Sequence, residues 1–162
     1  MIFVTVGTHE QQFDRLIRKV DDLVADGTIT EPVFIQTGYC VYEPQHCEWA
    51  HFVPAPEMLG RMESADVIVT HGGPSSFIEA IAAGKVPVVV PRRAEYGEHV
   101  NDHQVDFVLE VAERKGGIVP VYEVADLAAA IEEARRLAAG GARFESHNAG
   151  FCNELEQLIE RL

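Results

Sequence analysis

The sequence has few cysteines and few basic residues, and each shortage argues against a class of protein. It contains three cysteines in 162 residues. This odd number does not indicate a disulfide framework, so we expect free thiols in a reducing compartment. Lys and Arg number 13 against 26 Asp and Glu, giving a formal net charge of −13. Such a charge disfavours binding to nucleic acid or anionic lipid, because both require a basic surface.

Long apolar runs and a secretion signal are also missing. No stretch of about 18 apolar residues occurs, so we expect no membrane span. The opening M-I-F-V-T-V has neither the basic segment nor the cleavage site of a signal peptide, and it is typical of a buried strand instead. We therefore expect a cytoplasmic domain.

Several catalytic motifs are absent. The chain has no P-loop lysine, no G-x-S-x-G turn and no complete G-x-G-x-x-G. Kinases, hydrolases of that type and dinucleotide-dependent dehydrogenases each depend on one of these segments. The sequence therefore disfavours all three classes.

Strand and helix patterns alternate along the chain. Strands are predicted at residues 2–6, 33–36, 51–53, 66–70, 86–90 and 117–121, and helices at residues 10–25, 56–63, 75–83, 101–114, 124–139 and 144–162. This alternation predicts an α/β fold: a single Rossmann-like domain over residues 1–162, with a mostly parallel sheet of about six strands flanked by helices. Ligands of such sheets bind outside the carboxyl ends of the strands. We therefore expect the site in the loops after the first, fourth and fifth strands.

A glycine-rich turn joins the fourth strand to a helix, T-H-G-G-P-S-S at residues 70–76. Glycines allow the main chain to approach a ligand closely, and a helix N-terminus attracts phosphate. A plain helix cap with glycine turns explains the same residues. The candidate contacts here are His71, Gly72, Gly73, Ser75 and Ser76.

One turn into this helix, Glu79 is surrounded by apolar helical neighbours. Its carboxylate can accept two hydrogen bonds from a vicinal diol, as acidic residues that bind ribose do. The alternative is an acidic residue that complements the positive end of the helix dipole.

The loop after the fifth strand concentrates hydrogen-bonding side chains. Arg92 and Arg93 stand out in an acidic protein and are candidates to contact a diphosphate. They are followed by E-Y-G-E-H-V-N-D-H-Q at residues 95–104, groups that suit sugar hydroxyls. A solvated polar loop is the alternative.

The turn after the first strand holds Gly7, Thr8 and His9. Thr8 is a good helix N-cap, and the turn lies at the predicted ligand edge. His9 is a candidate proton-transfer group because an imidazole titrates near neutral pH. A surface or capping histidine is the alternative.

Four potential zinc ligands lie within twelve residues: Cys40, His46, Cys47 and His51. Their spacing lacks a paired C-x-x-C knuckle. A loop of polar residues and thiols is favoured, and no metal site is expected.

Three ordered motifs resemble one group of glycosyltransferases. They are V-T-H-G-G-P-S-S-F-I-E-A, G-K-V-P-V-V-V-P-R and E-H-V-N-D-H-Q, preceded by I-F-V-T-V-G-T-H-E-Q-Q-F-D-R-L-I and F-I-Q-T-G-Y. The chain resembles the carboxyl-terminal, donor-binding domain of GT-B glycosyltransferases related to the peptidoglycan N-acetylglucosaminyltransferase. It is more similar still to stand-alone versions of that domain. These are the catalytic subunit of the dolichol-linked N-acetylglucosaminyltransferase and the bacterial capsule and exopolysaccharide β-1,4-galactosyltransferase subunits.

The resemblance implies a UDP-sugar substrate and no cofactor. It places the donor diphosphate at Gly72, Gly73, Ser75 and Ser76, and the ribose at Glu79. The donor sugar is expected at Asn101, Asp102 and Gln104, and the uracil near Phe52 and Val53. In the expected reaction, main-chain N–H groups, the serines and either Arg92 or Arg93 would stabilise the departing UDP, and no metal is required. The absence of D-x-D from the chain agrees with that expectation.

The resemblance also implies a partner, because a GT-B enzyme binds its acceptor in a second Rossmann-like domain. We expect a membrane-associated acceptor-binding subunit that recruits this chain to the inner face of the membrane and that supplies the catalytic base if His9 does not. The expected reaction moves a hexose to a polyprenyl-diphosphate-linked saccharide with inversion. A noncatalytic UDP-sugar-binding accessory subunit is the alternative, and an epimerase is disfavoured. The first candidate for the partner surface is the final helix, with Leu155, Leu158, Ile159 and Leu162; packing of these residues on the sheet is the favoured alternative.

Overall fold

The computed structural model describes residues 1–114, 116–140, 153 and 157. Its strands are β1 Ile2–Thr5, β2 Val33–Gln36, β3 Glu48–Ala50, β4 Val67–His71, β5 Val88–Val90 and β6 Val119–Pro120. Its α-helices are α1 Asp14–Ala25, α2 Ala55–Ser64, α3 Pro74–Ala82, α4 His103–Arg114 and α5 Leu127–Ala139. Two 3-10 turns, η1 Ala94–Tyr96 and η2 Val124–Asp126, complete the described elements.

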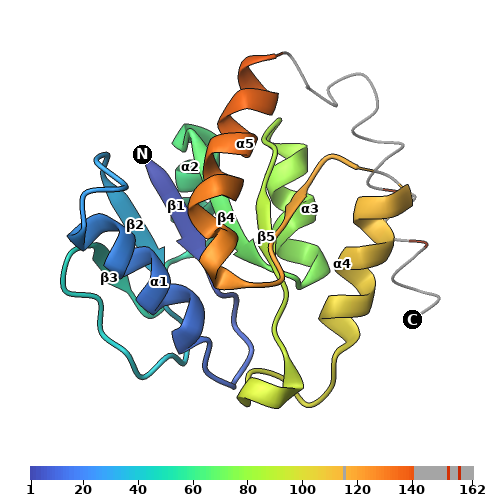
Figure 1. Ribbon diagram of the computed structural model, residues 1–162, viewed down its shortest axis with the longest axis horizontal. Coiled ribbons are helices and arrows are strands. Elements are labelled where there is room, and N and C mark those ends of the chain that lie inside the picture. Colours follow the sequence, from blue (N-terminus) through green and yellow to red (C-terminus); the bar gives the residue numbers. More distant parts are fainter. Residues whose placement is uncertain (115, 141–152, 154–156, 158–162) are drawn as a thin grey trace.

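The six strands form one parallel sheet in the order β3-β2-β1-β4-β5-β6 (Figure 1). The expected α/β fold with one Rossmann-like sheet is confirmed. The final predicted helix, residues 144–162, lies outside the described residues apart from Asn153 and Gln157, and so does the partner surface assigned to it.

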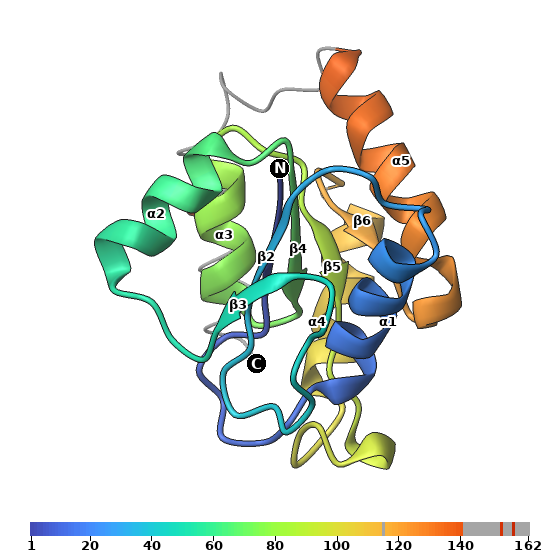
Figure 2. The same ribbon diagram turned by 90° about the vertical axis from the view of Figure 1, so that its left-hand side faces the viewer.

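Helices cover both faces of the sheet, so each strand is buried on two sides. In β1, Ile2 and Val4 pack with α1 and α5, whereas Phe3 belongs to the cluster beneath α2 and α3. Figure 2 shows α2 and α3 on one side of the sheet and α1 and α5 on the other. Burial on both faces explains the continuous β-branched runs in the sequence, because such strands need apolar residues in both directions.

The third strand lies three residues earlier than predicted. The prediction followed the apolar pair Phe52 and Val53, whereas β3 spans Glu48–Ala50 and pairs with residues 34–36 of β2. β3 is an edge strand whose residues are partly or largely exposed. Its position is set by main-chain pairing with β2, so the apolar pattern was a poor guide.

Helix α1 also begins later than predicted, at Asp14 instead of residue 10. Phe13 occupies the N-cap position, and the side-chain oxygen of Gln12 accepts the Asp14 N–H at 2.7 Å. The expectation that Thr8 caps this helix was wrong. Residues 7–12 instead form a loop at the carboxyl edge of the sheet.

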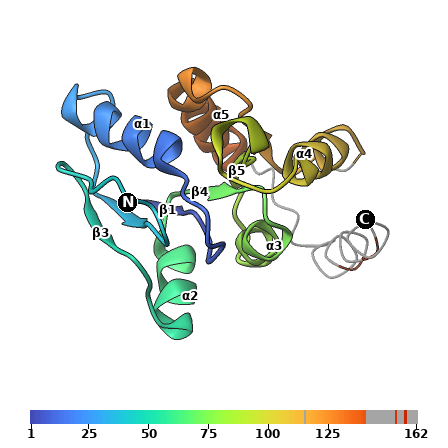
Figure 3. The ribbon, with the colours of Figure 1, turned by 90° about the horizontal axis from the view of Figure 1, so that it is seen from below.

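The sheet reverses its direction of growth between β1 and β4. From β1 the chain proceeds outward to β2 and β3, and it then returns to place β4 on the other side of β1. Such a switch point opens a crevice at the carboxyl ends of the two strands. Figure 3 views the molecule from this side, where the loops after β1, β4 and β5 lie.

None of the described helices combines the length and apolar character needed to cross a bilayer.

Replacing a core residue of α1 tests this packing. Leu16 has no exposed surface and belongs to the cluster formed by β1, α1 and α5. We expect Leu16→Ala to lower the free energy of unfolding by about 2–5 kcal/mol, because it removes buried methyl groups and leaves a cavity. Urea denaturation measures the change. Leu109→Ala on α4 is the matched control, since Leu109 is 39% exposed, and a similar loss there would contradict the assigned core.

Candidate functional site

A cleft of about 730 Å³ lies at the switch point between β1 and β4. It brings together eight of the residues expected at the site: Gly7, Thr8, His9, Val53, His71, Ser75, Ser76 and Glu79. The remaining lining residues are Thr5, Ala55, Met58, Leu59 and Met62. The cleft therefore joins the loop after β1, the segment after β3, helix α2 and the start of α3.

The start of α3 forms one wall of the cleft. The first N–H groups of any α-helix lack partners within the helix. Here the Gly72 N–H donates to Gln104 Oε1 at 3.1 Å, and the Gly73 N–H donates to His71 Nδ1 at 3.0 Å. Pro74 has no N–H, so the first unpaired main-chain N–H groups within the helix belong to Ser75 and Ser76, which both line the cleft. The N–H groups of both glycines therefore donate hydrogen bonds within the protein.

His71 lies beneath the cleft between two glycines. A Cβ atom at either Gly7 or Gly73 would overlap the imidazole ring, and Gly7 adopts a φ of 77°, which favours glycine. The His71 Nε2 atom lies 3.1 Å from Ser76 Oγ. Burial, followed by the nearby charge of Arg92, lowers the pKa of His71 to about 3. The imidazole is therefore neutral at neutral pH.

The opposite wall of the cleft is apolar and comes from α2. Met58, Leu59 and Met62 line it, and Leu59 is 50% exposed. These three residues were not among those predicted for the site. Their spacing was a usable signal, because apolar residues three and four positions apart lie on one face of a helix.

Glu79 lies on α3 one turn beyond Ser75 and Ser76 and is exposed at the cleft. A turn of α-helix rises about 5 Å along its axis. The helix therefore presents hydrogen-bond donors and a carboxylate to the same cleft at a spacing of one turn.

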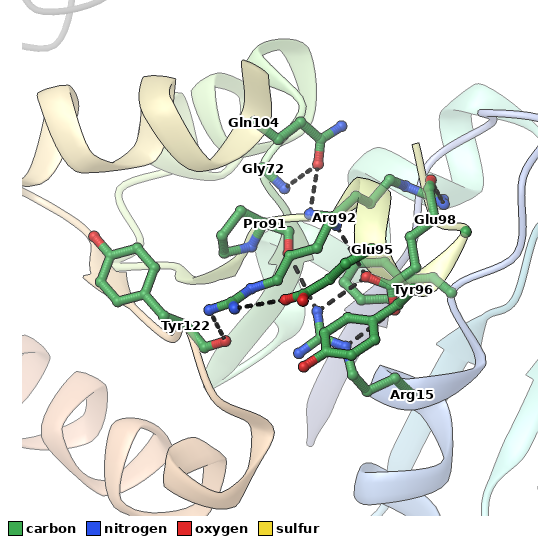
Figure 4. A network of polar contacts seen from close by, with 12 residues as sticks. Arg15, Gly72, Pro91, Arg92, Glu95, Tyr96, Glu98, Gln104 and Tyr122 are labelled. Carbon is green, nitrogen blue, oxygen red and sulfur yellow. Dashed lines mark hydrogen bonds and ion pairs between the residues drawn. The ribbon is translucent and has the colours of Figure 1, made fainter. Parts of the chain in front are cut away.

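Arg92 does not face the cleft, contrary to the expectation that it contacts a diphosphate. The residue has no exposed surface, and its guanidinium donates to four main-chain carbonyls. Its main-chain N–H and that of Gly72 share the side-chain oxygen of Gln104 (Figure 4). The four carbonyl oxygens that accept from the guanidinium belong to Val6 at 2.6 Å, Gln11 at 2.8 Å, Glu98 at 3.1 Å and Gln12 at 3.2 Å. Burial lowers its pKa to about 10, so it remains charged at neutral pH. This cation holds the loops after β1 and β5 together.

A buried ion pair supports the same junction. Arg15 of α1 donates from Nε and Nη2 to the two carboxylate oxygens of Glu98, both at 3.0 Å, and Glu98 is fully buried. The neighbouring Arg93 donates to the Tyr122 carbonyl at 2.7 Å and to Glu95 at 3.2 Å. These arginines are therefore engaged within the protein.

The polar residues assigned to the donor sugar are mostly engaged within their own loop. Asp102 accepts the Ala94 N–H at 2.9 Å, and Asn101 accepts the His103 N–H at 3.1 Å. Gln104 is buried, and its side-chain oxygen accepts the N–H groups of Gly72 and Arg92. None of the three lines the cleft, so their contact with a sugar remains a prediction.

Phe52 also lies outside the residues that line the cleft. Its ring packs edge-on against Tyr39 at a centroid distance of 5.3 Å, and both side chains are about half exposed. Val53, the next residue, does line the cleft.

His9 stacks on His99 from the loop after β5. The ring centroids are 4.5 Å apart and nearly parallel, and His9 Nε2 lies 2.8 Å from Gln11 Oε1. Burial and the charge of His9 lower the pKa of His99. His9 is the one expected catalytic group, and it lies at the edge of the cleft.

The two histidines of the candidate zinc cluster have other partners, and its two cysteines are protonated thiols at neutral pH. His51 Nδ1 lies 3.0 Å from both Thr37 Oγ1 and the Gly38 carbonyl, and His46 lies 3.6 Å from the carboxylate of Asp21. Burial raises the pKa of the Cys40 and Cys47 thiols to about 11 and 12. Within the described ranges, no three His, Cys, Asp or Glu residues gather as a metal site.

The buried neutral His71 predicts a loss of stability in mild acid. Its pKa falls from the ordinary 6.5 to about 3 on folding, so between these values the unfolded chain binds a proton that the folded chain does not. The free energy of unfolding then decreases as the pH falls, by up to about 1.4 kcal/mol per pH unit. Urea denaturation between pH 6.5 and pH 5 measures the slope. A His71→Gln variant with the same slope would contradict this assignment.

The hydrogen bonds of Arg92 indicate that its substitution will destabilise the folded protein. We expect Arg92→Met to lower the free energy of unfolding by about 3 kcal/mol or more, since it leaves several buried carbonyls without a partner. Thermal and urea denaturation measure the effect. Arg114→Met is the control, because that side chain is 64% exposed at the end of α4. Equal effects of the two substitutions would show that the contacts of Arg92 contribute little to the free energy of unfolding.

Comparison with known proteins supports the fold and gives the family. The model of the glycosyltransferase family 28 C-terminal domain matches residues 1–161. Two solved structures share the fold: a glycotransferase of kitacinnamycin, with 22% identity and a TM-score of 0.60, and the glycosyltransferase SnogD from Streptomyces nogalater, with 16% identity and a TM-score of 0.54.

Both structural matches cover 99% of this chain, but the chain spans only 42% and 43% of those two proteins. No curated protein sequence matches the chain. The family model nevertheless covers almost every residue, including the loops that form the cleft. The chain belongs to the glycosyltransferase family 28 C-terminal domain family.

Proposed function

We propose that this chain is the donor-binding half of a two-component inverting glycosyltransferase that uses a UDP-sugar. The observation that carries the proposal is the cleft at the β1–β4 switch point, where the start of α3 and the carboxylate of Glu79 face the same space. Membership of the glycosyltransferase family 28 C-terminal domain family supports it independently.

The donor diphosphate is assigned to Ser75 and Ser76. Both line the cleft in the first turn of α3, where main-chain N–H groups and the helix dipole favour an anion. Two hydroxyls add further hydrogen bonds to the phosphate oxygens. The local groups thus stabilise a diphosphate although the chain as a whole carries a formal net charge of −13.

The nucleoside is assigned to the rest of the cleft. A nucleotide lying along α3 presents its phosphates to the first turn and its ribose to Glu79, one turn further on. The carboxylate of Glu79 accepts the two ribose hydroxyls. Val53 and the apolar wall of α2 then offer a surface for the base, as the resemblance to the family implies for the segment at Phe52 and Val53.

The proposed reaction is a displacement at the anomeric carbon. An acceptor hydroxyl oxygen forms the new bond, the bond to the diphosphate oxygen breaks, and the electron pair leaves with UDP. The groups at the start of α3 stabilise the charge that develops on UDP, which is where fixed dipoles lower a barrier most. The proton of the acceptor passes to a general base, either His9 or a residue of the partner.

We assign binding of the acceptor to a membrane-associated partner protein. The acceptor is a polyprenyl-diphosphate-linked saccharide of capsule or exopolysaccharide synthesis. The chain spans less than half of the two solved glycosyltransferases, which leaves room for a second domain. The loops after β2, β3 and β5, at the carboxyl edge of the sheet, and helix α2 expose large apolar side chains that we call the apolar rim: Tyr39, Val41, Phe52, Leu59, Tyr96 and Val100. We propose that the acceptor-binding partner covers this rim, because exposed apolar surface marks protein contacts.

Calorimetric titration with UDP tests the donor site. We expect UDP to bind, ADP to bind more weakly, and Glu79→Gln to weaken UDP binding roughly tenfold, because the variant loses charged hydrogen bonds to the ribose. Competition by UDP-galactose, UDP-glucuronic acid and UDP-N-acetylglucosamine then ranks the donor sugars.

Glu132→Gln is the matched control for this titration. Its carboxylate is 75% exposed on α5, away from the cleft, so we expect unchanged UDP affinity. Equal binding of UDP and ADP, or an unaffected Glu79→Gln variant, would contradict the nucleoside assignment. No UDP binding by the chain would contradict the donor site itself.

A further inference from the structure

The amide of Gln104 has a fixed orientation. Two main-chain N–H groups, from Gly72 and Arg92, donate to one end of this side chain at 3.1 and 3.0 Å. Only the carbonyl oxygen of an amide can accept both. The amide nitrogen must therefore occupy the other end, 3.4 Å from His71 Nδ1.

This orientation determines where the proton of His71 lies. The Nδ1 atom faces two donors, the Gly73 N–H at 3.0 Å and the Gln104 amide. It must therefore be the unprotonated nitrogen of the ring. The neutral imidazole then carries its hydrogen on Nε2, which lies 3.1 Å from Ser76 Oγ.

The hydrogen on His71 Nε2 fixes the role of the Ser76 hydroxyl. Its oxygen accepts the hydrogen of His71 Nε2, so its own hydrogen is free to point elsewhere. No other hydrogen-bond partner of this hydroxyl occurs in the part of the chain that the structure describes. Ser76 lines the cleft, and its hydrogen is therefore available to a ligand there.

We propose that His71 is a positioning residue which, held by Gln104 and the Gly73 amide, orients the Ser76 hydroxyl to donate to the diphosphate of the nucleotide. The inference rests on the proposed donor site and explains how one hydroxyl of that site is oriented. The ring is confined between Gly7 and Gly73, which prevents its rotation into another hydrogen-bond pattern. Its neutrality at working pH follows from burial and from the neighbouring Arg92.

The tautomer is measured first, on the chain without a ligand. Nitrogen NMR of the labelled imidazoles at neutral pH should show a hydrogen on Nε2 of His71 and none on Nδ1. The His71→Gln variant, which lacks the ring, assigns the signal. A ring protonated on Nδ1, or on both nitrogens, would overturn the inference whatever the chain binds.

Two matched substitutions then separate the two sides of the ring. In His71→Asn, the side-chain oxygen can still accept the Gly73 N–H, but the side chain is too short to reach Ser76. In His71→Gln, the side chain can place an amide N–H near the position of Nε2. We expect Ser76→Ala and His71→Asn each to weaken UDP binding roughly tenfold. His71→Gln should recover most of the affinity, which a merely structural role of His71 would not produce.

A double-mutant cycle completes the test. If His71 acts through Ser76, adding Ser76→Ala to His71→Asn should cause little further loss of UDP affinity, because the same hydrogen bond is already lost. Ser75→Ala is the control, since no hydrogen bond joins Ser75 to His71 in the described structure, and its effect should add to that of His71→Asn. Thermal unfolding confirms that each variant is folded.

Additive losses for His71→Asn and Ser76→Ala, in a chain whose wild type binds UDP, would overturn this inference and leave the donor site standing. Failure of the wild-type chain to bind UDP would overturn the donor site and with it the ligand that Ser76 serves. The two failures are therefore distinguishable.

Discussion

The ligand edge of this domain depends on one buried cation. The guanidinium of Arg92 donates to the carbonyls of Val6, Gln11 and Gln12, which lie 80 to 86 residues away in the sequence, and to the carbonyl of Glu98 in its own loop. Main-chain carbonyls removed from water require partners, and irregular loops cannot supply them through strand pairing. A single charged side chain satisfies several at once, and it thereby fixes the position of loops that have no regular structure of their own.

The arrangement of the sheet was predictable because its cause is visible in the sequence. Residues 2–6 and 86–90 are nearly all apolar, which is required of strands buried on both faces. The rule that ligands bind at the carboxyl ends of parallel strands then placed Thr8, Ser76 and Glu79 near one another, and the structure brings all three into one cleft.

The direction of individual side chains was not predictable. Arg92 was expected to contact a diphosphate because it is a basic residue in a loop at the ligand edge. Its partners are instead main-chain carbonyls, three of them 80 or more residues away, and no spacing rule connects them. The same limit applies to Met58 and Leu59, whose place opposite α3 is set by the path of α2 across the sheet. Sequence identifies which groups can bind, whereas tertiary structure decides what they bind.

The switch point has a consequence for folding. β1 pairs with β2 and with β4, and the second pairing joins residues about 65 positions apart, such as Thr5 and Thr70. Contacts of such long range form late and slowly, because the intervening chain must first be ordered. The cleft exists only once that pairing is complete. A nucleotide that occupies the cleft would therefore bind only the folded protein. By mass action it would shift the folding equilibrium toward the folded state.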